Sequence, residues 1–282
     1  MELKLLNSIL SIQPQEILYH YTSQSGLYGI ITSRSLWATD IHYVNDSFEF
    51  SYAIDMAKRI LDSKWKNEIE FTEMIKSHLL SICSVHKYVF SLTAKGNLLS
   101  QWRGYCPKSG GYALGFDSKK LTEIASRDHE FYLYPCCYDV PTQHELIQEV
   151  LKEAFEKYLE VKKDCFDPND ISKKCWGQFT SRFEVIASIV KDPSWSEEHE
   201  WRLASPPLKT THPQFKIREG KYNLIPYIEI PLGNSPDELP FKKVIVGPTP
   251  HQELAMESVG DLLSINNLHC SVERSFIPFR DF

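Results

Sequence analysis

The order of short strand-like segments and long helix-like segments constrains the fold of this 282-residue chain more than any other feature. Short apolar runs typical of strands occur in both halves, and long charged segments with apolar residues at i, i+3 and i+4 lie between them. The order of strands, helices, strands, helices and strands differs from the regular alternation of a parallel βαβ array. We therefore predict an α+β fold with a mixed, mostly antiparallel sheet.

The middle of the sequence, at about 140–190, is predicted to be a helical insertion. Its second helical segment carries Trp176, Phe179 and Phe183 on one face, which we expect to point inward. The chain length fits a single domain, residues 1–282, that carries this insertion. Strands are predicted at 17–21, 35–40, 88–92, 111–116, 200–204, 227–230, 243–246 and 271–276. Helices are predicted at 23–32, 50–61, 67–83, 144–163 and 172–191, with a further helix after residue 250.

Composition and charge exclude several classes of protein. Apolar residues make up 42% and charged residues 24% of the chain, which is typical of a folded globular protein. The net charge is −6, whereas a protein that binds nucleic acid irrespective of sequence is normally basic. Nucleic acid is therefore disfavoured as the main partner.

The chain is predicted to be cytoplasmic, without contact to a membrane. The first apolar stretch is interrupted by Asn7, Ser8 and Pro14, and it lacks the features of a secretory signal. No window approaches the roughly 20 apolar residues that a membrane helix needs. The seven cysteines include no CxxC pair, so we predict neither a structural zinc site nor a disulfide framework.

The first candidate site residues lie in the segment Tyr19–Ser23. A histidine at the end of a strand, here His20, can hydrogen-bond a ribose hydroxyl. The neighbouring Tyr21 offers a face for a flat heterocycle, and Thr22 adds a hydroxyl. The alternative is that His20 is a half-buried histidine whose hydrogen bonds are satisfied within the protein.

A second group of candidates lies between residues 91 and 116. Trp102, Arg103, Tyr105 and Tyr112 occur among glycines, and the segment 101–105 is predicted to be a loop. Arginine can bind phosphate oxygens in a fork, and aromatic rings can stack on a base or on nicotinamide. The segment matches neither a phosphate-binding P-loop nor a GxGxxG motif. The alternative is a packed hairpin with an exposed arginine.

The third group is the segment Trp195–Arg202. On a strand, alternation would place Glu198, Glu200 and Arg202 on the same face. We predict that Arg202 orients Glu200 through a forked salt bridge and keeps it ionised. The alternative is a solvated, charged edge strand. One histidine, His199, between two glutamates is poor metal-binding geometry on a strand, so no metal is predicted here.

Taken in order, these clusters resemble the bacterial family called domain of unknown function 2971 (DUF2971). Members of that family are largely uncharacterised. The resemblance extends over nearly the whole chain and is specific as a set. The matching residues are His20-Tyr21-Thr22-Ser23, Asn45-Asp46 with Glu49, Trp102-Arg103-Gly104-Tyr105, Gly111-Tyr112, and Trp195 with Glu198, Glu200, Trp201 and Arg202, followed by Val244–Pro248 and Ser275–Arg280.

The chain is also similar, more weakly, to the ADP-ribosyltransferase superfamily. In that superfamily a first-strand histidine, a middle aromatic or hydroxyl residue and a late glutamate surround the nicotinamide riboside of NAD. The similarity implies His20 and Glu200 for the first and third places, and Ser91, Thr93 or Tyr112 for the second. The chain lacks the doubled tyrosine-rich helix of the diphtheria-toxin-like branch. The implied NAD-binding residues are Tyr21, Thr22, Ser91, Trp102, Arg103, Tyr105, Tyr112 and Arg202, with NAD as substrate and no metal.

The first functional hypothesis is therefore an NAD-dependent ADP-ribosyltransferase or NAD-glycohydrolase, in the setting of a toxin or a phage-defence effector. Glu200 would stabilise the positive charge that builds on the sugar, and Glu198 would serve a protein or nucleic-acid acceptor. The alternatives are a non-catalytic module that senses a nucleotide, and an enzyme that modifies nucleic acid. On the first hypothesis, His20, Tyr21, Trp102, Arg103 and Glu200 should line one concave site.

Overall fold

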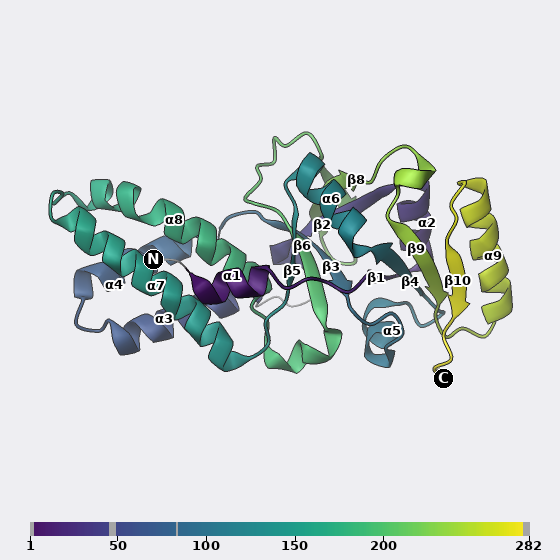
Figure 1. The fold of residues 1–282 in the computed structure, drawn as a ribbon, viewed down its shortest axis with the longest axis horizontal. Helices are drawn as coiled ribbons and strands as arrows, with labels where there is room; N and C mark the ends of the chain where they lie inside the picture. The colour runs from purple at the N-terminus through teal and green to yellow at the C-terminus, as the bar shows by residue number, and fades with distance from the viewer. Residues whose placement is uncertain (1–2, 45–48, 83, 279–282) are drawn as a thin grey trace.

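A computed structural model describes residues 3–44, 49–82 and 84–278 (Figure 1). A bundle of helices forms one end of the elongated molecule, and a twisted sheet with its own covering helices forms the other. Each part has its own buried hydrophobic core. The functional candidates lie mainly on the strands.

The sheet is mostly antiparallel, as predicted, and within it only the β9–β10 pair is parallel among the described residues. The strand order is β10-β9-β4-β1-β3-β2-β8-β7, and β6 pairs with both β3 and β5. The strands are β1 (Ile17–Thr22), β2 (Ser35–Asp40), β3 (Tyr88–Thr93), β4 (Tyr112–Asp117), β5 (Tyr132–Pro135), β6 (Glu200–Ala204), β7 (Phe215–Glu219), β8 (Leu224–Pro231), β9 (Phe241–Val246) and β10 (Ser271–Arg274).

The sheet divides at β3. Along one edge β3 pairs continuously with β6, from Val89 to Thr93. Along its other edge, β2 pairs with the first two residues, and β1 reaches it only at Thr93. The middle of this edge, around Ser91, has no strand partner, so its backbone groups are available to side chains. This division creates the opening in which the candidate site lies.

The helical part is larger than the predicted insertion. The long hairpin of α7 (Val140–Lys162) and α8 (Pro168–Ile189) packs against α3 (Glu49–Lys64), α4 (Ile69–Ile82) and α1 (Lys4–Leu10). Trp176, Phe179 and Phe183 are buried in this core, which confirms their predicted inward orientation. Asp139 and Asp167 cap α7 and α8, and each helix carries a proline in its first turn.

The remaining helices cover or flank the sheet. They are α2 (Gln24–Ser33), α5 (Leu99–Tyr105), α6 (Ser118–His129), α9 (Gln252–Ile265) and the 3-10 helices η1 (Ile41–Tyr43), η2 (Pro193–Glu198) and η3 (Pro236–Glu238). The prediction of a loop at 101–105 is wrong, because these residues form most of α5. Helices α1 and α6 and strands β5 and β7 were not predicted; α1, β5 and β7 have seven, four and five residues, whereas α6 has 12 and is amphipathic. No described helix is both long and apolar enough to cross a bilayer.

Candidate functional site

Three adjoining hollows form a cleft at the division of the sheet. Their volumes are about 50, 190 and 350 Å³, and His20 lines all three. Glu200 lines the first two, where Ser91 and Tyr105 also contribute. The structure thus brings together residues that lie 180 positions apart in the sequence, from β1 and β6.

His20 is held in one orientation by the unpaired edge of β3. Its Nδ1 lies 2.9 Å from the carbonyl oxygen of Ser91, and its ring packs 4.3 Å from that of Phe90. Because a carbonyl oxygen only accepts, Nδ1 carries the proton and Nε2 remains an acceptor. Burial lowers the pKa of His20, so the ring is neutral at pH 7.

Two carboxylates and two cations meet beside His20, and we call Lys191, Glu198, Glu200 and Arg202 the ionic cluster. Lys191 Nζ lies 2.6 Å from Oε2 of Glu198 and 2.6 Å from Oε2 of Glu200. Arg202 binds Glu200 in a fork, with Nε 2.7 Å from Oε1 and Nη2 2.9 Å from Oε2. All four side chains are buried, and their charges cancel. The predicted fork between Arg202 and Glu200 is present.

The cations determine the protonation state of Glu200. Burial alone would raise the pKa of this carboxyl, but Arg202 and Lys191 together outweigh burial and lower it well below its usual range. Arg202 is itself anchored, because Nη1 donates to the carbonyl oxygen of Ser188 on α8 at 3.0 Å. Lys191 lies 5.0 Å from the ring centre of Trp195. The cluster therefore presents an ionised, rigidly held Glu200 to the cleft.

Glu198 reaches the cluster from a different element than predicted. It ends η2 rather than lying on β6, and His199 between the two glutamates has a positive φ of 43°. This turn brings both carboxylates onto Lys191, although strand alternation does not apply. The Tyr105 hydroxyl donates to Oε1 of Glu198, and Thr93 Oγ1 donates to its backbone oxygen at 2.6 Å. Helix α5 is thereby tied to the ionic cluster.

The other predicted site residues divide between the cleft and its surroundings. Tyr21 lines the first hollow, and its hydroxyl donates to the carbonyl oxygen of Lys95 at 2.9 Å. Trp102 is buried behind Tyr21, at a ring separation of 4.6 Å, and supports the wall of the cleft. Trp102 and Arg103 do not line these three hollows, and their place in one concave site with His20 stays a prediction.

The three residues considered for the second place of the ADP-ribosyltransferase motif lie in two different hollows. Ser91 and Thr93 both line the first hollow. Tyr112 instead lines another groove, between α2 and α9. Thr22 lines the third hollow. Of the other motif residues that resemble the family, Asn45, Asp46, Phe279 and Arg280 lie outside the described residues.

Arg218 and Trp37 are among the cleft residues that the sequence did not indicate. Arg218, on β7, lines the second and third hollows, and its Nη2 donates to Thr39 Oγ1 at 3.3 Å. Its Nε is buried and has no hydrogen-bond partner among the described residues. Trp37, on β2, lines the same hollows with 42% of its surface exposed, and its ring stands 4.9 Å from that of Tyr227. A guanidinium beside an exposed indole is suited to an anionic, aromatic ligand.

Comparison with known proteins gives one match. Residues 101–203 match the family described as "Protein of unknown function (DUF2971)". The predicted resemblance to DUF2971 is confirmed over this segment. Searches of curated proteins and of solved structures returned no match, and the similarity to ADP-ribosyltransferases is not shown.

The DUF2971 match begins within α5 and ends on β6. It therefore contains Tyr105 and the whole ionic cluster, but it contains neither His20 nor Arg218. The matched segment supplies the charged wall of the cleft, while β1, β2 and β7 supply the opposite side.

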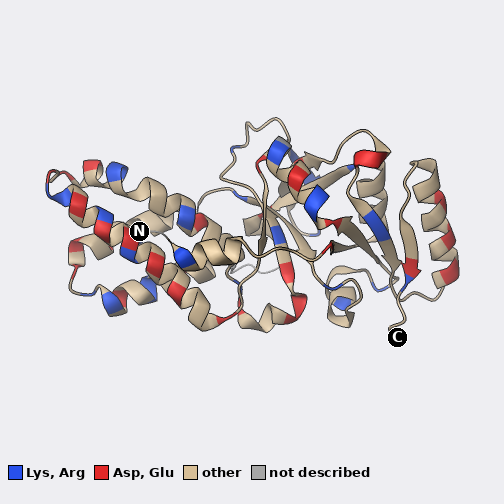
Figure 2. Cartoon of the chain, viewed as in Figure 1, with Lys and Arg blue, Asp and Glu red and all other residues tan. Residues whose placement is uncertain are grey.

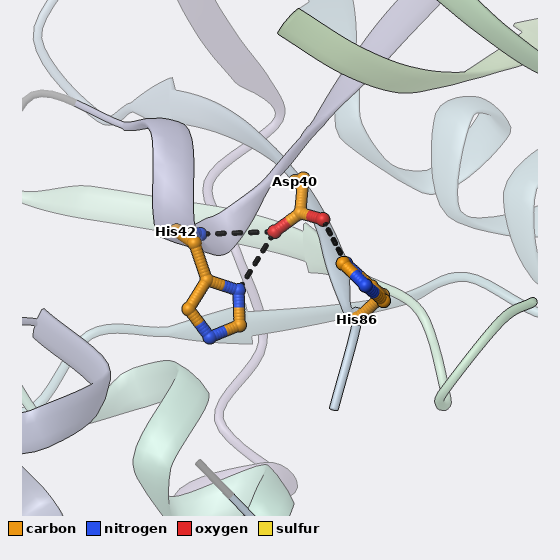
Figure 3. A group of neighbouring side chains, drawn as sticks. All are labelled: Asp40, His42 and His86. Atoms are coloured by element: carbon orange, nitrogen blue, oxygen red, sulfur yellow. Dashed lines mark hydrogen bonds and ion pairs between the residues drawn. The ribbon is translucent and has the colours of Figure 1, made fainter. Parts of the chain in front are cut away.

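A second group of polar residues lies outside the DUF2971 match. Asp40 at the end of β2, His42 in η1 and His86 just before β3 come together, as Figure 3 shows. Oδ1 of Asp40 lies 2.9 Å from His42 Nδ1 and accepts from the His42 backbone N–H at 3.0 Å. Oδ2 lies 2.6 Å from His86 Nδ1. The sequence did not indicate this group, because the two histidines are far apart along the chain.

Proposed function

We propose that this protein cleaves the nicotinamide–ribose bond of NAD, as an ADP-ribosyltransferase or an NAD-glycohydrolase. One observation carries the proposal: His20 and Glu200 line the same hollow from β1 and β6, which pair with opposite edges of β3. A toxin or phage-defence effector is the setting that we propose for such an activity.

The proposed chemistry assigns a separate task to each side of the cleft. As the bond between nicotinamide and C1 of the ribose breaks, the leaving nitrogen takes the electron pair and positive charge builds on the sugar. An ionised Glu200 beside the ribose stabilises that charge, and such groups are worth ~10²–10³ in rate. Water or an acceptor nucleophile then bonds to C1 and loses its proton. His20 Nε2 accepts a hydrogen bond from a ribose hydroxyl.

The far end of the cleft would bind the rest of the dinucleotide. In this proposal Arg218 pairs with the phosphates, because its guanidinium has no carboxylate partner among the described residues and faces two of the hollows. Trp37 stacks on the adenine ring. Both contacts serve binding, so they are shared with a protein that holds a nucleotide without cleaving it.

A non-catalytic nucleotide sensor is the second candidate, and the ionic cluster favours it. Lys191 and Arg202 offset the charge of Glu200, which weakens its effect on a neighbouring cation. An enzyme acting on nucleic acid has less support. Acidic and basic side chains are interspersed along the helices in Figure 2, and the net charge is −6.

The deciding experiment measures binding and cleavage separately. Purified protein is titrated with NAD by calorimetry, and release of nicotinamide is then followed with NAD labelled in the nicotinamide ring. Release by the wild-type protein, reduced in a Glu200→Gln variant, supports the enzyme. Binding without release, in the presence of candidate protein and nucleic-acid acceptors, supports the sensor. Absence of binding contradicts both.

A further inference from the structure

We propose that Asp40, His42 and His86 form a binding site for a divalent transition-metal ion, with zinc as the best-suited ion. Their ligand atoms all lie within 4.8 Å of one another. The Asp40 side chain is fully buried, whereas those of His42 and His86 are 33% and 50% exposed. An ion can therefore enter from solvent and meet a fixed carboxylate at the base of the site (Figure 3).

The donor set suits zinc. Both rings turn Nδ1 toward the same carboxylate, and two imidazoles with one carboxylate are a common zinc ligand set that leaves a fourth position for water. Zinc–ligand bonds of about 2.0–2.1 Å hold neighbouring ligands roughly 3.3 Å apart. The present separations of 2.9 and 2.6 Å are hydrogen bonds, so the rings must move outward by several tenths of an ångström. Their exposure permits that movement.

The position of the cluster indicates what the ion would do. Asp40 ends β2, His42 lies in η1, and His86 precedes β3. Helices α3 and α4 leave the sheet after η1 and return just before His86. The chain before α3 and the chain after α4 are already joined by a hydrogen bond from the Ile41 N–H to the Lys87 carbonyl oxygen, at 2.8 Å. An ion bound by residues on both sides of the α3–α4 segment would hold the two ends of that segment together.

The same ion would also fix one wall of the cleft. Tyr43, the last residue of η1, lines the second hollow. His42 is its neighbour in η1, so an ion bound to His42 restrains this short helix. The metal proposal itself does not depend on NAD chemistry, because the ligands lie outside the three hollows.

The test is a zinc titration of chelator-treated full-length protein in reducing buffer, with a chromophoric zinc indicator as competitor. We expect the wild type to bind one zinc ion with micromolar or tighter affinity that neither His42→Gln nor His86→Gln binds as tightly. Loss of a supporting partner alone costs 10–100-fold in affinity, so loss of a ligand should cost at least ten-fold. His269→Gln, an exposed histidine elsewhere, should bind as the wild type does.

Two further measurements distinguish this site from the cysteines and from misfolded variants. Zinc should raise the melting temperature of the wild type and of His269→Gln, but not of the two cluster variants. Cobalt(II) bound to the wild type should show d–d absorption without thiolate charge-transfer bands. Equal zinc binding in wild type and cluster variants, or a thiolate spectrum for the tightest cobalt site, would overturn the proposal, as would an unchanged wild-type melting temperature.

Discussion

The ionic cluster and the group of Asp40, His42 and His86, which we call the Asp40 cluster, both bury a carboxylate, but they surround it with different partners. In the ionic cluster, two carboxylates meet two cations, and all four side chains are buried. In the Asp40 cluster, one buried carboxylate meets two histidines that remain partly exposed. Burial of a carboxylate is costly in either place unless hydrogen-bonding partners accompany it.

The difference lies in how far each group can adjust. The side chains of the ionic cluster are almost fully buried, so the loss of one cation leaves a carboxylate that is no longer fully compensated. His42 and His86 can turn toward solvent, and water can replace either ring. Rigidity suits a group that presents a fixed charge to a ligand, whereas adjustable rings suit a group that accepts an ion. Four predictions follow from this contrast, in order of decreasing effect.

Removing a cation from the ionic cluster should cause the largest loss of stability. Arg202→Met leaves Glu200 buried with one cation and should lower the free energy of unfolding by about 3–5 kcal/mol. Arg274→Met is the matched control, because its pair with Glu253 is exposed and worth about 0–1 kcal/mol. Denaturant unfolding of both variants measures the difference. Equal losses would show that the cluster is not the rigid element described above.

Replacing the central carboxylate should separate chemistry from folding. Glu200→Gln keeps the shape of the side chain but leaves Lys191 and Arg202 with one carboxylate between them, so the protein should be less stable yet still folded, and nicotinamide release per folded molecule should fall at least ~10²-fold. Glu198→Gln should reduce NAD cleavage less and transfer to an acceptor more. Glu253→Gln, at an exposed site, controls for a general effect of charge. A fully active Glu200→Gln protein would exclude Glu200 as the catalytic carboxylate.

Arg218 tests whether the cleft binds phosphate at its far end. A hydrogen bond to a charged group contributes about 1.5–3 kcal/mol, so Arg218→Gln should weaken ADP binding by roughly 10- to 100-fold. Adenosine has no phosphate, and its affinity should change little. Calorimetric titration of both ligands, with Arg274→Gln as the control protein, gives the comparison. Equal weakening for adenosine would assign Arg218 a structural role instead.

Acid should act on the ionic cluster through Glu200. The folded-state pKa of Glu200 is lowered from 4.5, the value expected in the unfolded chain, because Arg202 and Lys191 outweigh burial. The ionised carboxylate therefore stabilises the fold fully above pH 4.5, and this contribution is lost as the pH falls toward the folded-state pKa. The free energy of unfolding, measured with urea at several pH values between about 6 and 3, should fall more steeply with decreasing pH for the wild type than for Glu200→Gln. Parallel curves would contradict the lowered pKa.

Sequence alone determined the features that depend on neighbouring residues. Apolar periodicity indicated the main strands and the long α7–α8 hairpin, and it identified the inward face of Trp176 and Phe183. The alternation of side chains along a strand indicated the fork between Glu200 and Arg202, because residues two apart share a face. These are local relations, and local backbone geometry is enough to establish them.

Only the tertiary structure decided which distant residues meet. Lys191 joins the two glutamates, Arg218 reaches the cleft from an edge strand, and His86 meets Asp40 across two strands. Seven-residue α5 was missed because it depends on the packing of Trp102 against Tyr21 more than on its own apolar pattern. Strand order and the division at β3 set these contacts, and neither leaves a periodic signal along the chain.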